Sequence, residues 1–195
     1  MRKPLLLLLL KDFSSIHSIS SIAKKLGSSR VGVWKVIKKL EEEKLVKIES
    51  VGSGKTSTQI IGINWDNSIV EKTLILYLSE EAEKQKRWIV NFSRLQGLAN
   101  FTILFGSIIH SPKEANDIDI LCVSEKTNLN KIQKTIDETQ KTQAKKIHSI
   151  NFTKFEFKKE LEKPNKAFIG AVKKGVVLFG QENFIQFIKE IQHGL

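Results

Sequence analysis

The sequence has few of the residues that stabilise small secreted domains. One cysteine among 195 residues excludes an intrachain disulfide framework and a cysteine-based zinc finger. The leucine run Leu5 to Leu10 is far shorter than the roughly 20 residues that cross a bilayer. Lys11 and Asp12 follow it directly, and no small-residue cleavage site appears. We therefore expect a buried first helix, no membrane partner and a cytoplasmic location.

Acidic residues are scarce in the first third of the chain. The whole sequence has a net charge of +11. Residues 1–65 carry 12 basic and 5 acidic residues, whereas residues 66–195 carry 20 and 16, so charge density is about three times higher in the first part. This distribution predicts a polyanionic partner, most simply nucleic acid, with a merely solvated face as the alternative.

Two short helices are expected after the leucine run. Residues 18–26 offer serines as N-caps and Gly27 as a terminator. A second helix begins near Ser29, and its apolar residues recur at i, i+4 and i+7, which makes one buried stripe. The opposite face carries Ser29, Arg30, Trp34, Lys35 and Lys38. This pattern is typical of a helix-turn-helix whose second helix contacts base edges and phosphates in the major groove.

A β-hairpin is expected next, from residues 45–51 and 56–63 with a glycine turn between them. Three helices and a hairpin make a winged helix. Residues 29–40 resemble the recognition helix of winged helix-turn-helix repressors, particularly the biotin-repressor-like group. The resemblance implies that residues 1–65 bind double-stranded DNA, with Lys55 of the wing near a backbone phosphate. A protein-interaction module remains the alternative.

The segment 51–57 is similar to a phosphate-binding P-loop but departs from it. Glu49 stands where that pattern has its first glycine, and the residues after the segment favour a strand. We therefore expect the turn of the wing here.

Residues 66–79 lack proline and glycine and predict a helical connector, which would equally serve in a homodimer. Ser79 is expected to cap a further helix.

The most informative stretch is residues 100–124. A strand over 101–105 leads into Gly106 and Ser107, and a second strand begins at Asp117. Side chains alternate along a strand, so Asp117 and Asp119 share one face about 7 Å apart, where their oxygens can bind Mg²⁺. Gly106 would allow close approach of a phosphate, and Ser107 would offer it a hydroxyl and an amide.

This motif consists of Gly-Ser, nine intervening residues and Asp-x-Asp. It resembles the motif of the polymerase-beta-type nucleotidyltransferases, most closely that of their minimal members, and the resemblance covers about residues 80–190. The resemblance implies an α+β protein in which residues 80–195 form a small α/β domain with a mixed sheet. It further implies that Gly106 and Ser107 grip a nucleoside triphosphate. Asp117 and Asp119 would be the catalytic ligands of two divalent metals, and a nucleoside monophosphate would pass to an acceptor hydroxyl, including one on a partner protein.

A third carboxylate, which active members of that superfamily carry on a nearby strand, is missing. No acidic residue occurs between Glu138 and Glu156. We expect Ser149 or Asn151 on the relevant face, neither of which supplies the charge. Glu156 fits a capping box with Thr153 instead, and His148 is offered as a replacement base. His110 and Lys113 are the nearby polar groups that could meet a phosphate.

Three functions therefore stay open. The first is a DNA-binding regulator that transfers a nucleotidyl group. The second is a regulator whose second domain is catalytically inactive and serves nucleotide sensing or dimerisation. The third is an interaction scaffold without chemistry. The sequence thus leaves open whether the protein is an enzyme. Separately, it predicts that Cys122, on the apolar strand after Asp119, is a buried packing residue.

Overall fold

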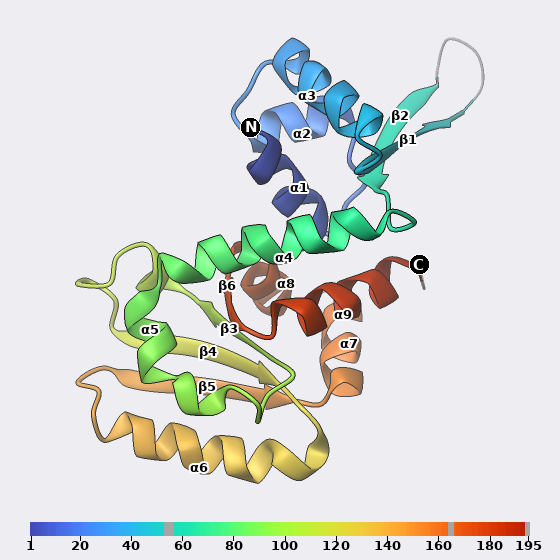
Figure 1. The fold of residues 1–195 in the computed structure, drawn as a ribbon. Coiled ribbons are helices and arrows are strands. Elements are labelled where there is room, and N and C mark those ends of the chain that lie inside the picture. The colour runs from blue at the N-terminus through green and yellow to red at the C-terminus, as the bar shows by residue number, and fades with distance from the viewer. Residues whose placement is uncertain (53–56, 164–165, 194–195) are drawn as a thin grey trace. The chain divides into compact units, whose positions relative to one another are not determined.

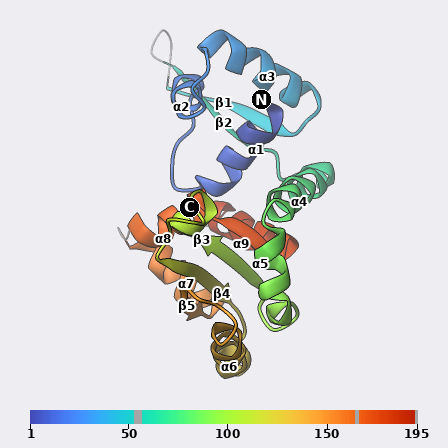
Figure 2. The same ribbon diagram turned by 90° about the vertical axis from the view of Figure 1, so that its left-hand side faces the viewer.

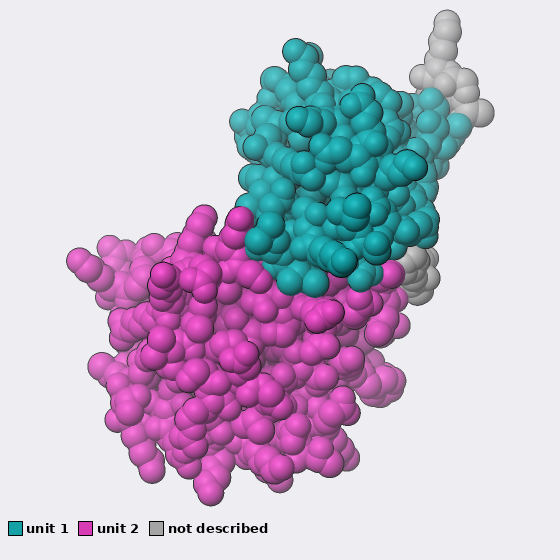
Figure 3. Space-filling model, in the orientation of Figure 1, with its two compact units in different colours: residues 1–77 teal, residues 78–195 magenta. Residues whose placement is uncertain are grey.

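The computed structural model describes residues 1–52, 57–163 and 166–193 (Figure 1). The chain divides into two compact units, Met1–Tyr77 and Leu78–Leu195 (Figure 3). Most of the expected wing turn, including Lys55, lies outside the described residues. The prediction of a wing contact by Lys55 therefore stays a prediction.

The described part of the first unit is a helix-turn-helix followed by an antiparallel hairpin (Figure 1). Its elements are α1 (Arg2–Lys11), α2 (Ile19–Lys25), α3 (Arg30–Glu42), β1 (Val46–Val51) and β2 (Thr58–Ile63). In the hairpin, Val46 pairs with Ile63 and Val51 with Thr58. Because a strand and not a helix resumes at Thr58, the P-loop alternative is wrong for this segment, and the predicted winged-helix order is confirmed.

Local sequence explains these helices. The leucines of α1 are the core of the unit, with Leu5, Leu6 and Leu10 fully buried. Ser18 caps α2 in a capping box with Ser21. Between α1 and α2, the buried carboxylate of Asp12 accepts a hydrogen bond from Ser15 and pairs with the ammonium of Lys25, which fixes the turn.

The second unit is built on a mixed four-stranded sheet of order β5-β4-β3-β6. Strand β3 runs antiparallel to β4 and β6, whereas β4 and β5 are parallel. The strands are β3 (Phe101–Phe105), β4 (Asp117–Val123), β5 (Lys146–Phe152) and β6 (Val176–Phe179). Helix α4 (Ser68–Glu83) begins in the first unit and ends in the second. The other helices of the second unit are α5 (Lys86–Asn91), α6 (Leu129–Gln140), α7 (Lys154–Glu162), α8 (Lys166–Lys174) and α9 (Gln181–His193), with short 3₁₀ turns at Ser93–Leu95, Ser107–Ile109 and Lys126–Asn128. The predicted mixed sheet is confirmed.

Both faces of this sheet are covered by helices (Figure 2). On one face, Ile118, Ile120 and Cys122 of β4 belong to a buried cluster with Trp88 of α5 and isoleucines of α6. On the other face, rings of α7, α8 and α9 contact Phe101 and Phe152. The alternation of β4 therefore leaves Asp117 and Asp119 on the aromatic face, at the end of the sheet where β3 turns.

One predicted boundary is wrong. Ser79 does not begin a helix, because α4 continues through it to Glu83 and the chain turns only at Lys84 and Gln85. The residues around Ser79 are good helix formers without glycine or proline, so the serine is accommodated inside the helix. Within the described residues, no helix is long and apolar enough to cross a membrane.

Candidate functional site

Helix α3 presents the side chains that the sequence predicts for DNA contact. Val33, Ile37 and Leu40 are fully buried, as the spacing predicts. Arg30 and Lys35 lie on the exposed surface, and no ion-pair partner is found for either within the described ranges. These two cations are therefore available to an external anion.

The other residues predicted on this face are partly engaged within the helix itself. Lys38 donates to Glu41 at 2.6 Å, and its ammonium lies 5.1 Å from the centre of the Trp34 ring. The hydroxyl of Ser29 caps the helix by accepting from the amide of Gly32. Ser29 therefore has a structural role as the cap of α3. Lys38 must leave its ion pair with Glu41 before it can contact a phosphate.

In the second unit, a tight turn after β3 brings Gly106 against Asp119. Gly106 has φ +80° and ψ −166°, a backbone conformation that is essentially restricted to glycine. A Cβ placed on Gly106 would overlap Oδ2 of Asp119. The glycine is therefore required twice, once by the backbone and once by the carboxylate that packs on it. Ser107 follows on the exposed surface.

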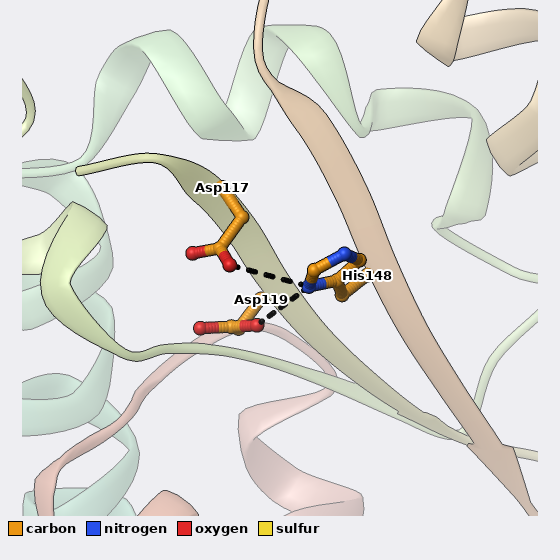
Figure 4. Close-up of side chains that lie close together, drawn as sticks. All are labelled: Asp117, Asp119 and His148. Carbon is orange, nitrogen blue, oxygen red and sulfur yellow. Dashed lines mark ion pairs between the residues drawn. The ribbon is translucent and has the colours of Figure 1, made fainter.

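Three potential metal ligands converge beside this turn (Figure 4). Asp117 and Asp119 extend from β4, and His148 extends from the parallel neighbour β5, where it pairs in register with Asp119. Nδ1 of His148 lies 3.3 Å from Oδ2 of Asp117 and 3.7 Å from Oδ1 of Asp119. The sequence suggests His148 only as a base, whereas the parallel register makes it the third member of the cluster.

The predicted face of Ser149 and Asn151 is wrong. Both side chains approach Gln133 of α6, on the side of the sheet opposite to the two aspartates. The reason is register: Asp119 pairs with His148, so the even-numbered residues of β5 share the face of the odd-numbered residues of β4. Nothing in the sequence alone sets this pairing.

The electrostatics of the cluster oppose the ionised form of Asp119. Burial raises the pKa of its carboxyl above the ordinary value, and the negative charge of Asp117 raises it further. The neighbouring His148 acts in the other direction through charge and hydrogen bonding. A divalent cation at this position would relieve the repulsion between the two carboxylates.

A cavity of about 380 Å³ adjoins the turn. It is lined by Phe105, Gly106, Ser107, His110, Gly170, Ala171 and Lys174. The predicted loop residue His110 is thus at the cavity, but Lys113 lines a neighbouring hollow instead. Lys174, an exposed cation at the end of α8, could not be found from the sequence because it lies almost 70 residues beyond the Gly-Ser turn.

Two further predictions are confirmed. Thr153 and Glu156 form the capping box of α7, and the hydrogen bonds from Thr153 lower the pKa of Glu156, so this acid is committed to the helix start. Cys122 is fully buried beside Thr102, and burial raises the pKa of its thiol to about 12. Neither residue adds a charge to the aspartate cluster.

Comparisons with known proteins bear on the first unit. Residues 2–54 match the family described as HTH domain. The match suggests a DNA-binding regulator. It covers α1 to α3 and the first strand of the hairpin, which are the elements that carry the exposed cations described above. No curated protein and no solved structure matches the chain.

Proposed function

We propose that the protein is a regulator that inserts α3 into the major groove of duplex DNA. The observation that carries this proposal is the pair of exposed cations, Arg30 and Lys35, on the outward face of a helix that lies within the HTH match. The first turn of the helix would meet base edges, and Lys35 would meet a phosphate. The excess of basic residues in the first third supports the same partner.

Salt dependence tests this proposal directly. A fluorescein-labelled duplex of random sequence is titrated with protein at several salt concentrations, and anisotropy gives the affinity. Log affinity should fall linearly with log salt, and Lys35→Ala should reduce the slope by about one unit. Lys158→Ala removes the same charge from an exposed position of α7 and should leave the slope unchanged. A salt-independent affinity, or equal slopes in all three proteins, would contradict DNA binding by α3.

We further propose that the second unit binds a nucleotide together with a divalent cation. The observation behind this step is the apposition of Gly106 and Asp119, next to a cavity lined by Ser107 and Lys174. Asp117 and Asp119 would hold the cation, which the nucleotidyltransferase resemblance assigns as Mg²⁺. When bound, such a cation neutralises charge on a triphosphate during in-line displacement. Ser107 and Lys174, which line the cavity, would donate hydrogen bonds to phosphate oxygens.

Nucleotidyl transfer and nucleotide sensing begin with the same bound complex and differ only in whether it reacts. In transfer, the oxygen of an acceptor hydroxyl on a partner protein bonds to the α-phosphorus, the bond to the bridging oxygen breaks, and pyrophosphate leaves while the hydroxyl proton passes to water. In sensing, the same complex forms without reaction. The convergence of His148 on the aspartates supports the cation site that both alternatives require, and the labelling experiment below separates them.

Calorimetry with Mg²⁺ and ATP or GTP tests the binding step. Asp119→Asn should weaken nucleotide binding more than tenfold, roughly the effect of lost metal affinity. Asp137→Asn removes an equivalent charge from the exposed side of α6 and is the matched control. Incubation with nucleotide labelled at the α-phosphate and a cell extract then separates the two outcomes. Label transferred by the wild type and not by Asp119→Asn supports transfer, whereas binding without label supports sensing.

A further inference from the structure

We propose that Asp117, Asp119 and His148 form one three-ligand site that prefers a first-row transition-metal cation, of the Mn²⁺ to Zn²⁺ series, over Mg²⁺. This inference rests on the proposed function of the second unit and changes the cation that the resemblance assigns to it. The observation that carries it is the position of an imidazole nitrogen within 4.8 Å of the two carboxylates.

The distances fit ligands of a single ion. Ligand atoms with bond lengths near 2.1 Å lie about 3.0 to 3.4 Å apart when they occupy adjacent positions of an octahedral or tetrahedral shell. The nitrogen of His148 is 3.3 Å and 3.7 Å from one oxygen of each aspartate. All three potential ligand atoms lie within 4.8 Å of one another. Small rotations of these side chains are enough to place them around one cation.

The ligands are carried by two hydrogen-bonded strands of the sheet. Asp119 and His148 are register partners in the parallel ladder of β4 and β5, two adjacent strands of the sheet. Ile118 and Ile147, next to the ligands in sequence, are buried on the opposite face. Gly106, in the turn that follows β3, lies against the carboxylate of Asp119. The backbone therefore holds the three ligands together before any cation arrives, which lowers the cost of binding.

The donor set decides the class of cation. Mg²⁺ prefers oxygen ligands and retains several waters, and a site of carboxylates alone suits it. An imidazole nitrogen suits Zn²⁺, Fe²⁺, Co²⁺ and Ni²⁺ and contributes little to Mg²⁺. Two carboxylates and one imidazole leave open coordination positions for phosphate oxygens or water, as a nucleotide-binding site requires. His148 thus acts here as a ligand that sets metal preference.

Metal binding to the full chain without nucleotide is the measurement. Calorimetry compares Zn²⁺, Mn²⁺ and Mg²⁺, and the visible absorption of added Co²⁺ reports nitrogen and oxygen ligation independently of any activity. We expect Co²⁺ and Zn²⁺ to bind more than about tenfold tighter than Mg²⁺. The affinity for Mn²⁺ is expected to be higher than that for Mg²⁺ and lower than those for Co²⁺ and Zn²⁺, because Mn²⁺ stands first in the order of ligand affinity along the series.

Variants of one residue separate the ligand role from other roles. His148→Ala should remove the preference by weakening Zn²⁺ and Co²⁺ at least tenfold while changing Mg²⁺ little. His148→Asp restores three carboxylates and should improve Mg²⁺ binding relative to the wild type. Ser149→Ala, on the same strand but on the opposite face, is the control and should behave as wild type. Circular dichroism confirms that each variant is folded.

The outcomes distinguish this inference from the function on which it rests. If Mg²⁺ binds as tightly as Co²⁺, or His148→Ala binds Co²⁺ as tightly as the wild type, the inference is overturned while cation and nucleotide binding by the aspartates stands. If no divalent cation binds, with or without ATP, both fail. If Asp119→Asn and His148→Ala each abolish the Co²⁺ spectrum and His148→Asp recovers Mg²⁺ binding, the three-ligand site is established.

Discussion

The two candidate sites are built in opposite ways. The exposed surface of α3 belongs to one helix, and its residues are neighbours because they are three and four apart in sequence. The aspartate cluster draws on two strands and on a glycine turn, and 28 residues separate Asp119 from its register partner His148. A surface of the first kind tolerates loss of single members, whereas a cluster of the second kind depends on one backbone arrangement. The two sites should therefore respond differently to mutation.

The largest expected effect is at the glycine turn. Gly106→Ala places a side chain where φ is +80° and pushes the Cβ into the carboxylate of Asp119. Gly97 has a similar φ of +83° but open space around its Cβ position, so Gly97→Ala is a matched control. We expect Gly97→Ala to lower the free energy of unfolding by about 1 to 2 kcal/mol. Gly106→Ala should cost about 3 kcal/mol, because its backbone conformation is more restricted and Asp119 must move.

Chemical denaturation followed by circular dichroism measures this difference, and Co²⁺ titration of the folded fraction shows whether the cluster survives. Equal losses in the two variants would mean that the contact between Gly106 and Asp119 contributes nothing.

A smaller effect is expected on α3. Glu41→Gln releases Lys38 from its 2.6 Å ion pair and leaves the ammonium available to a phosphate. DNA affinity should rise about twofold to fivefold, the range set by an exposed ion pair. Glu42→Gln removes the same charge from an exposed glutamate that has no ion-pair partner among the described residues. If the two variants raise affinity equally in the anisotropy titration, the gain reflects net charge alone and not release of Lys38.

The same contrast explains what could be predicted from the sequence. The period of Val33, Ile37 and Leu40 identified both the buried and the exposed face of α3, since helical neighbours follow from spacing alone. The sequence predicts the strand β3 at its observed bounds because its apolar run ends at Gly106. In both cases the information is local to the segment.

The parts that were missed depend on pairing between distant segments. His148 faces the aspartates because β5 lies parallel to β4 in one particular register, and a shift by one residue would have brought Ser149 there instead. Lys174 reaches the cavity because α8 packs on β3. The alternation of side chains along β5 determines which residues share a face, but it does not determine which of the two faces meets Asp119. The sequence therefore offers His148 and Ser149 as candidates and does not decide between them.

The smallest expected effect tests whether repulsion between Asp117 and Asp119 lowers the free energy of unfolding. Burial and Asp117 raise the pKa of Asp119, so the folded state binds that proton more tightly than the unfolded chain. Above the folded-state pKa, the ionised carboxylate therefore destabilises the protein. Well below the ordinary value of 3.8, both states are protonated and the penalty vanishes. Asp119→Asn should raise the free energy of unfolding at pH 7, and the gain should shrink as the pH falls through the folded-state pKa.

Thermal unfolding at pH 7 and at acid pH checks this, with the exposed Asp137→Asn as the variant that should change little at either pH. Adding Co²⁺ at pH 7 should then reverse the order of stability, because a ligand that binds only the folded wild type stabilises it by mass action and leaves Asp119→Asn unchanged. A variant that is less stable than wild type at both pH values would show instead that Asp119 supports the turn at Gly106 more than it opposes Asp117. The cluster would then be a structural feature of the sheet that, unlike the surface of α3, does not tolerate the loss of a single member.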